Sequence, residues 1–262
     1  MQSYMTQSQA WQPEFDEGRH SRARLGFILM ATDLAAEADF YDMTPKDVGI
    51  HITRLKSDDY TTNDTLMRHI ETMAQAAARL QPDAKPHLIS YTCTSGSMVI
   101  GIQKVMAEIK KGAPWAQPMC LGQAILDALK ALNIKKLVLG TPYLDEITQM
   151  EVNFLHENGY ELVNVQGLNL ATGWQMGRVT PNYWREFALS IDRSEADAIF
   201  LSCSGIRALE VAQAIEDETG KPVITSNQAH FWSCLRRVGI DDTLQGFGRL
   251  FSYSSQSFMD VL

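Results

Sequence analysis

One short pattern occurs twice in the 262-residue chain, and this repetition constrains the fold more than any other feature. The stretch Ile89–Gly96 reads Ile-Ser-Tyr-Thr-Cys-Thr-Ser-Gly, and the stretch Phe200–Ile206 reads Phe-Leu-Ser-Cys-Ser-Gly-Ile. Each is an apolar run that passes through a cysteine into small polar residues, ahead of a helix-like pattern. This order predicts a strand, a tight turn and a helix N-terminus, with a thiol at the turn.

A second pair of residues keeps the same spacing. Cys93 and Cys203 are 110 residues apart, and so are Asp33 and Tyr143, each of which follows the first predicted strand of its half. Two matches to one offset favour an internal duplication. The alternative is that any two α/β halves look alike.

Predicted strands alternate with predicted helices along the chain, which is typical of parallel sheets covered on both faces. The strands are predicted at 24–31, 48–55, 87–91, 136–140, 160–165, 198–201 and 223–225. The helices are predicted at 34–41, 62–80, 97–111, 123–132, 145–157, 181–191, 205–218 and 228–238, with a linker at 112–118.

We therefore expect an α/β fold of two pseudo-symmetric, Rossmann-like (flavodoxin-like) lobes, with the active site in the cleft between them. Residues 1–21 are polar and form an N-terminal tail. Residues 22–118 together with 228–262 are predicted to form the first lobe, and residues 119–227 the second.

Charge and composition exclude several partners. A net charge of −8 and a pI near 5.2 argue against nucleic acid or an anionic membrane, because both need a basic face. No apolar run approaches the roughly 18 residues that span a bilayer, and residues 1–21 lack the apolar core of a signal peptide. We expect a cytoplasmic protein whose four cysteines are reduced thiols, without the close spacing of a structural zinc site.

The chemistry is expected where strands end. Asp33, Cys93, Tyr143 and Cys203 all follow predicted strands, and ligands of open α/β sheets bind at the carboxyl ends of strands. Amides after each cysteine form an anion pocket that suits a carboxylate, and the same helix dipole favours thiolate over thiol. Two thiols that flank one carbon suit proton transfer, because one takes a proton and the other returns one.

Donors for the developing enediolate are expected beside the two thiols. They are the hydroxyls of Thr94, Ser95, Ser204 and Tyr143 and the turn amides, including that of Gly205. The sequence has no glycine fingerprint for a dinucleotide, no Walker-type loop and no histidine-rich metal spacing, so we expect neither a cofactor nor a metal.

Taken in order, these motifs resemble the aspartate/glutamate racemase superfamily, and more closely its branch with maleate cis–trans isomerase and arylmalonate decarboxylase. Within that branch the chain is most similar to the ectoine/hydroxyectoine-utilisation subgroup. The resemblance covers about residues 24–250. The matching motifs are Ala31-Thr32-Asp33, Tyr91-Thr92-Cys93-Thr94, Thr141-Pro142-Tyr143, Leu201-Ser202-Cys203-Ser204 and Thr225-Ser226-Asn227-Gln228-Ala229, the last running into Trp232–Leu235.

The resemblance implies a cofactor-free site between the lobes, with Cys93 and Cys203 as the paired acid/base or nucleophile. Asn227 is a candidate for orienting the substrate. The decarboxylases have glycine where this chain has Cys93, which disfavours a decarboxylase. The maleate isomerases have asparagine at the place of Asp33, which instead suits a cationic or neutral polar group. The carboxylate-binding positions that the resemblance implies are Ser90, Thr94, Ser95 and Tyr143.

Three hypotheses follow. The first is a cofactor-independent racemase, epimerase or isomerase of a small carboxylate, acting in hydroxyectoine breakdown. The second is a maleate-type cis–trans isomerase in which one thiolate adds to a double bond, with an arylmalonate-type decarboxylase as a further alternative. The third is a non-catalytic small-carboxylate binding or sensor protein, since two α/β lobes around a cleft also suit that role. For the enzyme we expect a homo-oligomer.

Overall fold

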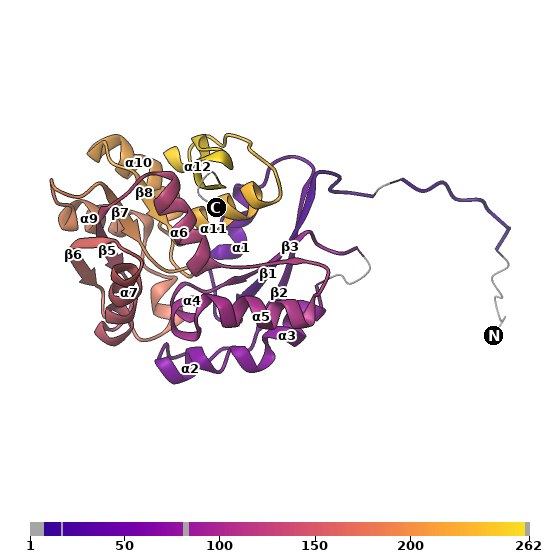
Figure 1. Ribbon diagram of the computed structural model, residues 1–262, viewed down its shortest axis with the longest axis horizontal. Coiled ribbons are helices and arrows are strands. Elements are labelled where there is room, and N and C mark those ends of the chain that lie inside the picture. The colour runs from indigo at the N-terminus through magenta and orange to yellow at the C-terminus, as the bar shows by residue number, and fades with distance from the viewer. Residues whose placement is uncertain (1–7, 17, 81–83, 260–262) are drawn as a thin grey trace, which may run out of the picture.

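Two four-stranded parallel sheets form the centre of the computed structural model, which describes residues 8–16, 18–80 and 84–259 (Figure 1). The first sheet has the order β2-β1-β3-β4, and the second has the order β6-β5-β7-β8. The prediction of two α/β lobes with parallel sheets is therefore confirmed. The strands are β1 Ala23–Met30, β2 Val48–Leu55, β3 Leu88–Thr92, β4 Gln117–Cys120, β5 Lys136–Thr141, β6 Glu161–Gly167, β7 Ala198–Leu201 and β8 Val223–Thr225.

Helices cover both faces of the sheets, as the alternation of buried side chains along β1 illustrates. Phe27 and Leu29 pack into one apolar layer with residues of α6 and α11, whereas Ile28 and Met30 pack into another layer with residues of α3 and α5. The helices are α1 Ala36–Asp42, α2 Asn63–Met67, α3 Ile70–Ala78, α4 Thr94–Ile100, α5 Ile102–Gly112, α6 Leu121–Ala131, α7 Asp145–Glu157, α8 Gly173–Met176, α9 Pro181–Ile191, α10 Leu209–Thr219, α11 Ser226–Arg237, η1 Arg249–Ser252 and α12 Gln256–Met259.

Each of these two apolar layers continues from one lobe into the other. The first contains Phe27 of β1 and Phe200 of β7, and the second contains Tyr91 of β3 and Val138 of β5. Because buried apolar surface is shared between the lobes, the carboxyl ends of the two sheets are held at a fixed separation. This shared packing positions the site described below.

Two helices that the sequence predicts as continuous are broken. The helix expected at 62–80 is α2 and α3, which are separated at Arg68 and His69 by a tighter turn in which the amide of His69 donates to the carbonyl of Leu66. The helix expected at 97–111 is α4 and α5, which meet at Gly101 with a φ of +95°. Apolar residues keep a helical period on both sides of each break, so periodicity alone does not reveal it.

Two other predictions of secondary structure are wrong. The expected linker 112–118 runs into the strand β4, which contains Pro118 and lies at the edge of its sheet, where a residue without an N–H is tolerated. The helix expected at 205–218 begins only at Leu209, because residues 204–207 form turns. Cys203 therefore does not directly precede a helix, in contrast to Cys93.

The N-terminal tail expected at 1–21 lies partly outside the described residues. Its residues 8–16 carry no helix or strand and extend away from the two lobes (Figure 1). Near the other end of the chain, α11 packs against α6, α1 and β3. The assignment of residues 228–262 to the first lobe stays a prediction, because α11 packs both against α1 and β3 of that lobe and against α6 and β8, which lie within residues 119–227.

Candidate active site

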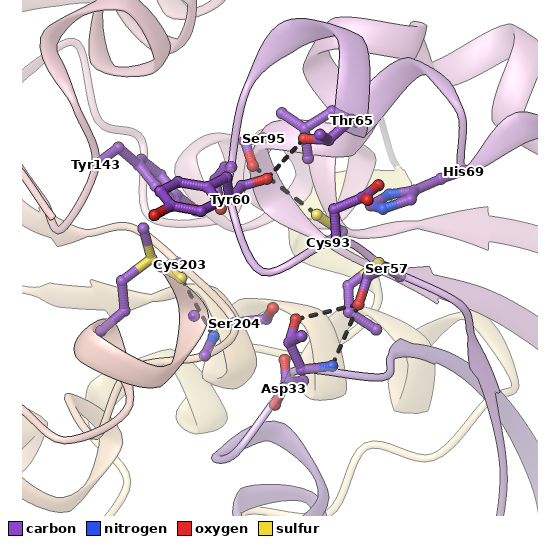
Figure 2. A pocket seen from close by; sticks show the side chains of 18 residues that line it. Asp33, Ser57, Tyr60, Thr65, His69, Cys93, Ser95, Tyr143, Cys203 and Ser204 are labelled. Atoms are coloured by element: carbon purple, nitrogen blue, oxygen red, sulfur yellow. Dashed lines mark hydrogen bonds between the residues drawn. The ribbon is translucent and has the colours of Figure 1, made fainter. Parts of the chain in front are cut away.

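A small cavity with a volume of about 60 Å³ lies between the lobes, at the carboxyl ends of the strands. Asp33 follows β1, Cys93 follows β3, Tyr143 follows β5 and Cys203 follows β7, and all four line this cavity. In Figure 2, Cys203 and Tyr143 lie on one side of it, and Cys93 lies on the other. The structure thus brings one thiol from each lobe to one site.

Cys93 is the N-cap residue of α4, and its sulfur receives several hydrogen bonds. The Sγ atom accepts from the Gly96 amide at 3.3 Å and lies 3.8 Å from the Ser95 hydroxyl, and the Tyr91 hydroxyl also bonds it. Burial nevertheless raises the pKa of the Cys93 thiol, and these hydrogen bonds offset it only in part. Desolvation opposes the expected preference of the helix N-terminus for the thiolate, and that preference stays a prediction.

Cys203 is held in an unusual backbone conformation. Its φ is +148°, in a region that glycine occupies far more readily than other residues and that costs about 1–3 kcal/mol. The Cys203 amide donates to the Ser226 hydroxyl at 2.9 Å, which helps to hold this turn. The Cys203 sulfur accepts from the Gly205 amide at 3.3 Å and bonds the Tyr143 hydroxyl. Burial raises the pKa of the Cys203 thiol far above its ordinary value.

Asp33 presents one carboxylate oxygen that is without a partner among the described residues. Its Oδ1 accepts from the amides of Ala35 and Ala36 at 3.0 and 2.9 Å, whereas the buried Oδ2 makes no hydrogen bond. Burial raises the pKa of Asp33, and the amides of Ala36 and Ala35 oppose this rise. A buried oxygen of this kind at a cavity wall calls for a ligand group that it can bond.

The remaining predicted residues fall into two groups. Ser95, Ser204 and Gly205 line the cavity with the four residues above. Ser90, Thr94 and Asn227 are not part of its lining. Their side chains bond other residues behind the wall: Ser90 bonds His230, Thr94 donates to Ser226 at 2.9 Å, and Asn227 donates to the Asp39 carboxylate at 2.7 Å and the Ser204 carbonyl at 2.8 Å.

Sequence reasoning missed one wall of the cavity, which is formed by the segment after β2. The lining residues from this segment are Ser57, Asp58, Tyr60, Thr61, Thr65, Leu66 and His69. Tyr60 forms an antiparallel bridge with Thr172, and the Thr61 amide donates to the Ala171 carbonyl at 3.1 Å, so the wall joins the two lobes. The signal was present in the sequence, because this polar segment follows the carboxyl end of a predicted strand.

Across residues 8–16, 18–80 and 84–259, no group of three or more His, Cys, Asp or Glu side chains is placed to hold a metal ion. Over the same ranges no helix is long and apolar enough to cross a bilayer.

The fold and the cavity define a class of protein: a two-lobed α/β protein with a buried cysteine from each lobe at one site. A family model described as arylmalonate decarboxylase (Amdase) matches residues 39–251. The chain belongs to this family.

Known proteins similar to the chain include both activities of the expected branch. A maleate isomerase from Nocardia farcinica is 24% identical over 244 residues, which are 88% of this chain and 96% of the relative. An arylmalonate decarboxylase from Bordetella bronchiseptica is 27% identical over 190 residues, which are 71% of this chain and 79% of the relative.

A solved structure shares the fold. A cysteine-to-serine variant of the Nocardia farcinica maleate cis–trans isomerase, with a covalently bound succinylcysteine intermediate, has a TM-score of 0.81 at 22% identity. The match covers 87% of this chain and 98% of that chain. With the family shown, the predictions of an enzyme and of the maleate isomerase and arylmalonate decarboxylase branch are confirmed.

Proposed function

We propose that the chain is a cofactor-independent cis–trans isomerase of a small unsaturated carboxylate, in which Cys93 adds to the double bond. The observation that carries this proposal is that two buried thiols, one from each lobe, line a single small cavity. The similarity to maleate isomerases, one of them with a succinylcysteine intermediate, supports it.

Cys93 suits the role of nucleophile better than Cys203. Its sulfur has the Gly96 amide and the Tyr91 and Ser95 hydroxyls as hydrogen-bond donors, which stabilise a thiolate. Burial raises the pKa of the Cys203 thiol far above its ordinary value, so this thiol stays protonated and suits proton donation.

The addition step conserves atoms and electrons. The Cys93 thiolate forms an S–C bond to one alkene carbon, and the π electrons move onto the carbon next to the carboxylate. The central bond is now single and rotates. Loss of the thiolate restores the double bond in the other geometry, and the Ser95 and Tyr143 hydroxyls are placed to stabilise the developing charge.

The cavity restricts the substrate to a small molecule. A space of about 60 Å³ holds about four to six water-sized groups, since one such group needs about 10–15 Å³. This size suits a short-chain acid rather than a nucleotide or a peptide.

A second candidate is the racemase or epimerase of a small carboxylate, in which the two thiols exchange protons with one carbon. The free Oδ2 of Asp33 favours it, because an amine or hydroxyl on the substrate would bond this oxygen. The relatives reported above are maleate isomerases and an arylmalonate decarboxylase, so a place in hydroxyectoine breakdown remains a prediction, as do a homo-oligomeric state and a cytoplasmic location.

The test is an NMR screen of small acids in D₂O, which starts with maleate and extends to amino and hydroxy acids. For the isomerase we expect a change of double-bond geometry in an unsaturated acid, with deuterium entering only at an alkene carbon that the Cys203 thiol protonates. Deuterium on the carbon next to the carboxylate of a saturated acid would instead establish the second candidate. Loss of carbon dioxide from a malonate would overturn both.

A further inference from the structure

One hydroxyl, that of Ser226, bonds both cysteine turns of the site. Ser226 is the first residue of α11 and is fully buried. Its Oγ atom accepts from the Thr94 hydroxyl at 2.9 Å and from the Cys203 amide at 2.9 Å. A hydroxyl oxygen has two lone pairs that accept hydrogen bonds, so both acceptor positions of Ser226 are filled.

The two bonds come from opposite lobes. Thr94 is the first residue of α4, the helix that Cys93 caps, and it follows a strand of the first sheet. Cys203 follows β7 of the second sheet. Ser226 therefore joins the turn of one site thiol to the turn of the other through two hydrogen bonds.

The Cys203 turn depends on such support. Its φ of +148° is unfavourable for a residue with a side chain, and a backbone of this kind persists only where its surroundings hold it. The neighbouring Asn227 adds a second contact, because its side-chain nitrogen donates to the Ser204 carbonyl at 2.8 Å and to the Asp39 carboxylate at 2.7 Å. Two consecutive residues of α11 thus hold the backbone on both sides of the Cys203 side chain.

The start of α11 is itself fixed. Thr225 caps this helix, since its hydroxyl accepts from the Gln228 amide and its own amide donates to the Gln228 side chain. Every residue of α11 from Ser226 to Arg236 is buried. A hydroxyl on a capped and fully packed helix end has little freedom to move, so it can hold the two turns at a fixed separation.

We propose that Ser226 is a positioning residue that sets the distance between the Cys93 and Cys203 thiols. It is not part of the cavity lining, and it acts through the Cys203 backbone and the Thr94 hydroxyl. The inference rests on the proposed function only in that the reaction uses both thiols, so it applies equally to the racemase or epimerase. Such placement matters for the rate, because a displacement of about 1 Å can cost about 100-fold.

The first experiment measures hydrogen–deuterium exchange of the Cys203 amide by NMR in the substrate-free full chain, relative to the amides of β7. Ser226→Ala removes the acceptor of this amide, so its exchange is expected to become about tenfold faster or more. Thr94→Val removes only the bond from the first lobe. It is expected to speed the same exchange by about threefold or more, because the Ser226 hydroxyl then loses one of its two contacts.

The matched control is Ser233→Ala, further along α11. Ser233 is also fully buried, and its hydroxyl donates to the Asp127 carboxylate of α6 at 2.6 Å rather than to a cysteine turn. Its loss is expected to lower the free energy of unfolding in urea while leaving relative exchange at Cys203 unchanged. Thr94→Ser keeps a hydroxyl at position 94 and is expected to restore wild-type exchange.

The second experiment measures kcat and KM of the same variants with maleate. Ser226→Ala is expected to lower kcat about 10- to 100-fold with KM within about threefold, because the lining residues that bind the substrate are unchanged. Ser233→Ala is expected to keep the wild-type values of both constants.

Unchanged relative exchange at Cys203 in Ser226→Ala, or in Thr94→Val, would overturn the coupling of the two turns. Faster exchange with a wild-type kcat, or an equal fall of kcat in Ser233→Ala, would overturn the positioning role and leave a structural one. Thr94→Val provides the result if Ser226→Ala does not fold, as judged by thermal denaturation. Exchange needs no substrate, so a chain that does not isomerise maleate contradicts the proposed function alone, and unchanged exchange leaves the screen of acids intact.

Discussion

The two cysteine turns occupy equivalent places in the two lobes, yet their surroundings differ. Cys93 caps a helix with ordinary φ and ψ, and its sulfur accepts from the Gly96 amide at 3.3 Å and lies 3.8 Å from the Ser95 hydroxyl. Cys203 sits in a strained turn before a helix that begins six residues later, and its sulfur contacts only Gly205 and Tyr143 among the hydrogen-bond partners described above. Each lobe supplies one thiol, and unequal surroundings give the two thiols unequal chemistry.

This difference explains how a nearly symmetric fold can support an asymmetric reaction. A thiol whose sulfur has amide and hydroxyl donors around it can form the thiolate that adds to a substrate. A thiol with a strongly raised pKa and no base of its own holds its proton until a carbanion nearby takes it. The following predictions test this division, beginning with the largest effect.

Replacing the two cysteines separates their roles most directly. Cys93→Ala and Cys203→Ala are each expected to lower kcat by about 10³-fold or more, as for loss of a nucleophile or its proton partner. Only Cys203→Ala is expected to accumulate a covalent adduct with substrate, because Cys93 still adds to the double bond. Intact-protein mass spectrometry measures the adduct. An adduct on Cys203 in the Cys93→Ala variant would reverse the assignment.

Buried carboxyls extend the comparison to stability. Glu151 of α7 in the second lobe is fully buried, and both its oxygens lack hydrogen-bond partners within the described residues, whereas Asp39 of α1 in the first lobe bonds Asn227. Burial raises the pKa of Glu151 from 4.5 to about 8. Between these values the folded chain holds a proton that the unfolded chain has released, so stability falls as pH rises.

Glu151→Gln is therefore expected to flatten the decline of the unfolding free energy between about pH 5 and 8, by up to about 1.4 kcal/mol per pH unit. Urea denaturation at each pH provides the measurement. Asp39→Asn is the matched variant, with a smaller flattening, because burial raises the Asp39 pKa only to about 7. An unchanged slope in Glu151→Gln would show that this carboxyl is ionised in the folded chain.

Many of the residues at the site could be predicted from the sequence, and there are physical reasons why the others could not. The common offset of Asp33, Cys93, Tyr143 and Cys203 was informative because parallel strands end at one edge of a sheet. Ser90 bonds His230 behind the wall because neighbouring side chains of a strand point to opposite faces, and position in the motif does not reveal which face.

His69 was not foreseen for a different reason. The helical period of apolar residues continues across the break between α2 and α3, so the sequence contains no sign of the turn that brings this ring to Tyr91. The pairing joins residues from two separate elements, and tertiary packing alone decides it. The strand β4 was missed because a proline in the middle of a short strand is uncommon away from sheet edges.

The glycines after the two cysteines give a sharper contrast. Gly96→Ala places a methyl 2.1 Å from the Tyr91 hydroxyl, so we expect a loss of about 1–3 kcal/mol of stability and slower alkylation of Cys93. Gly205→Ala places a methyl 3.7 Å from the Cys203 sulfur, an ordinary contact, so we expect a change within about 0.5 kcal/mol. Urea denaturation measures both, and equal losses would contradict the proposed difference between the two turns.

The smallest effect is expected at Asp33, which follows β1 in the first lobe as Tyr143 follows β5 in the second. Asp33→Asn keeps the acceptor for the Ala35 and Ala36 amides and replaces the free Oδ2 with an N–H donor. A substrate carboxylate near this position is then bonded rather than repelled, so we expect KM for a dicarboxylate to fall about three- to tenfold while kcat changes little. Steady-state kinetics with maleate measures both constants. If KM rises instead, Asp33 binds a hydrogen-bond donor of the substrate. The racemase or epimerase then explains the site better than the isomerase does. In that case the two halves of the site bind chemically different ends of one molecule.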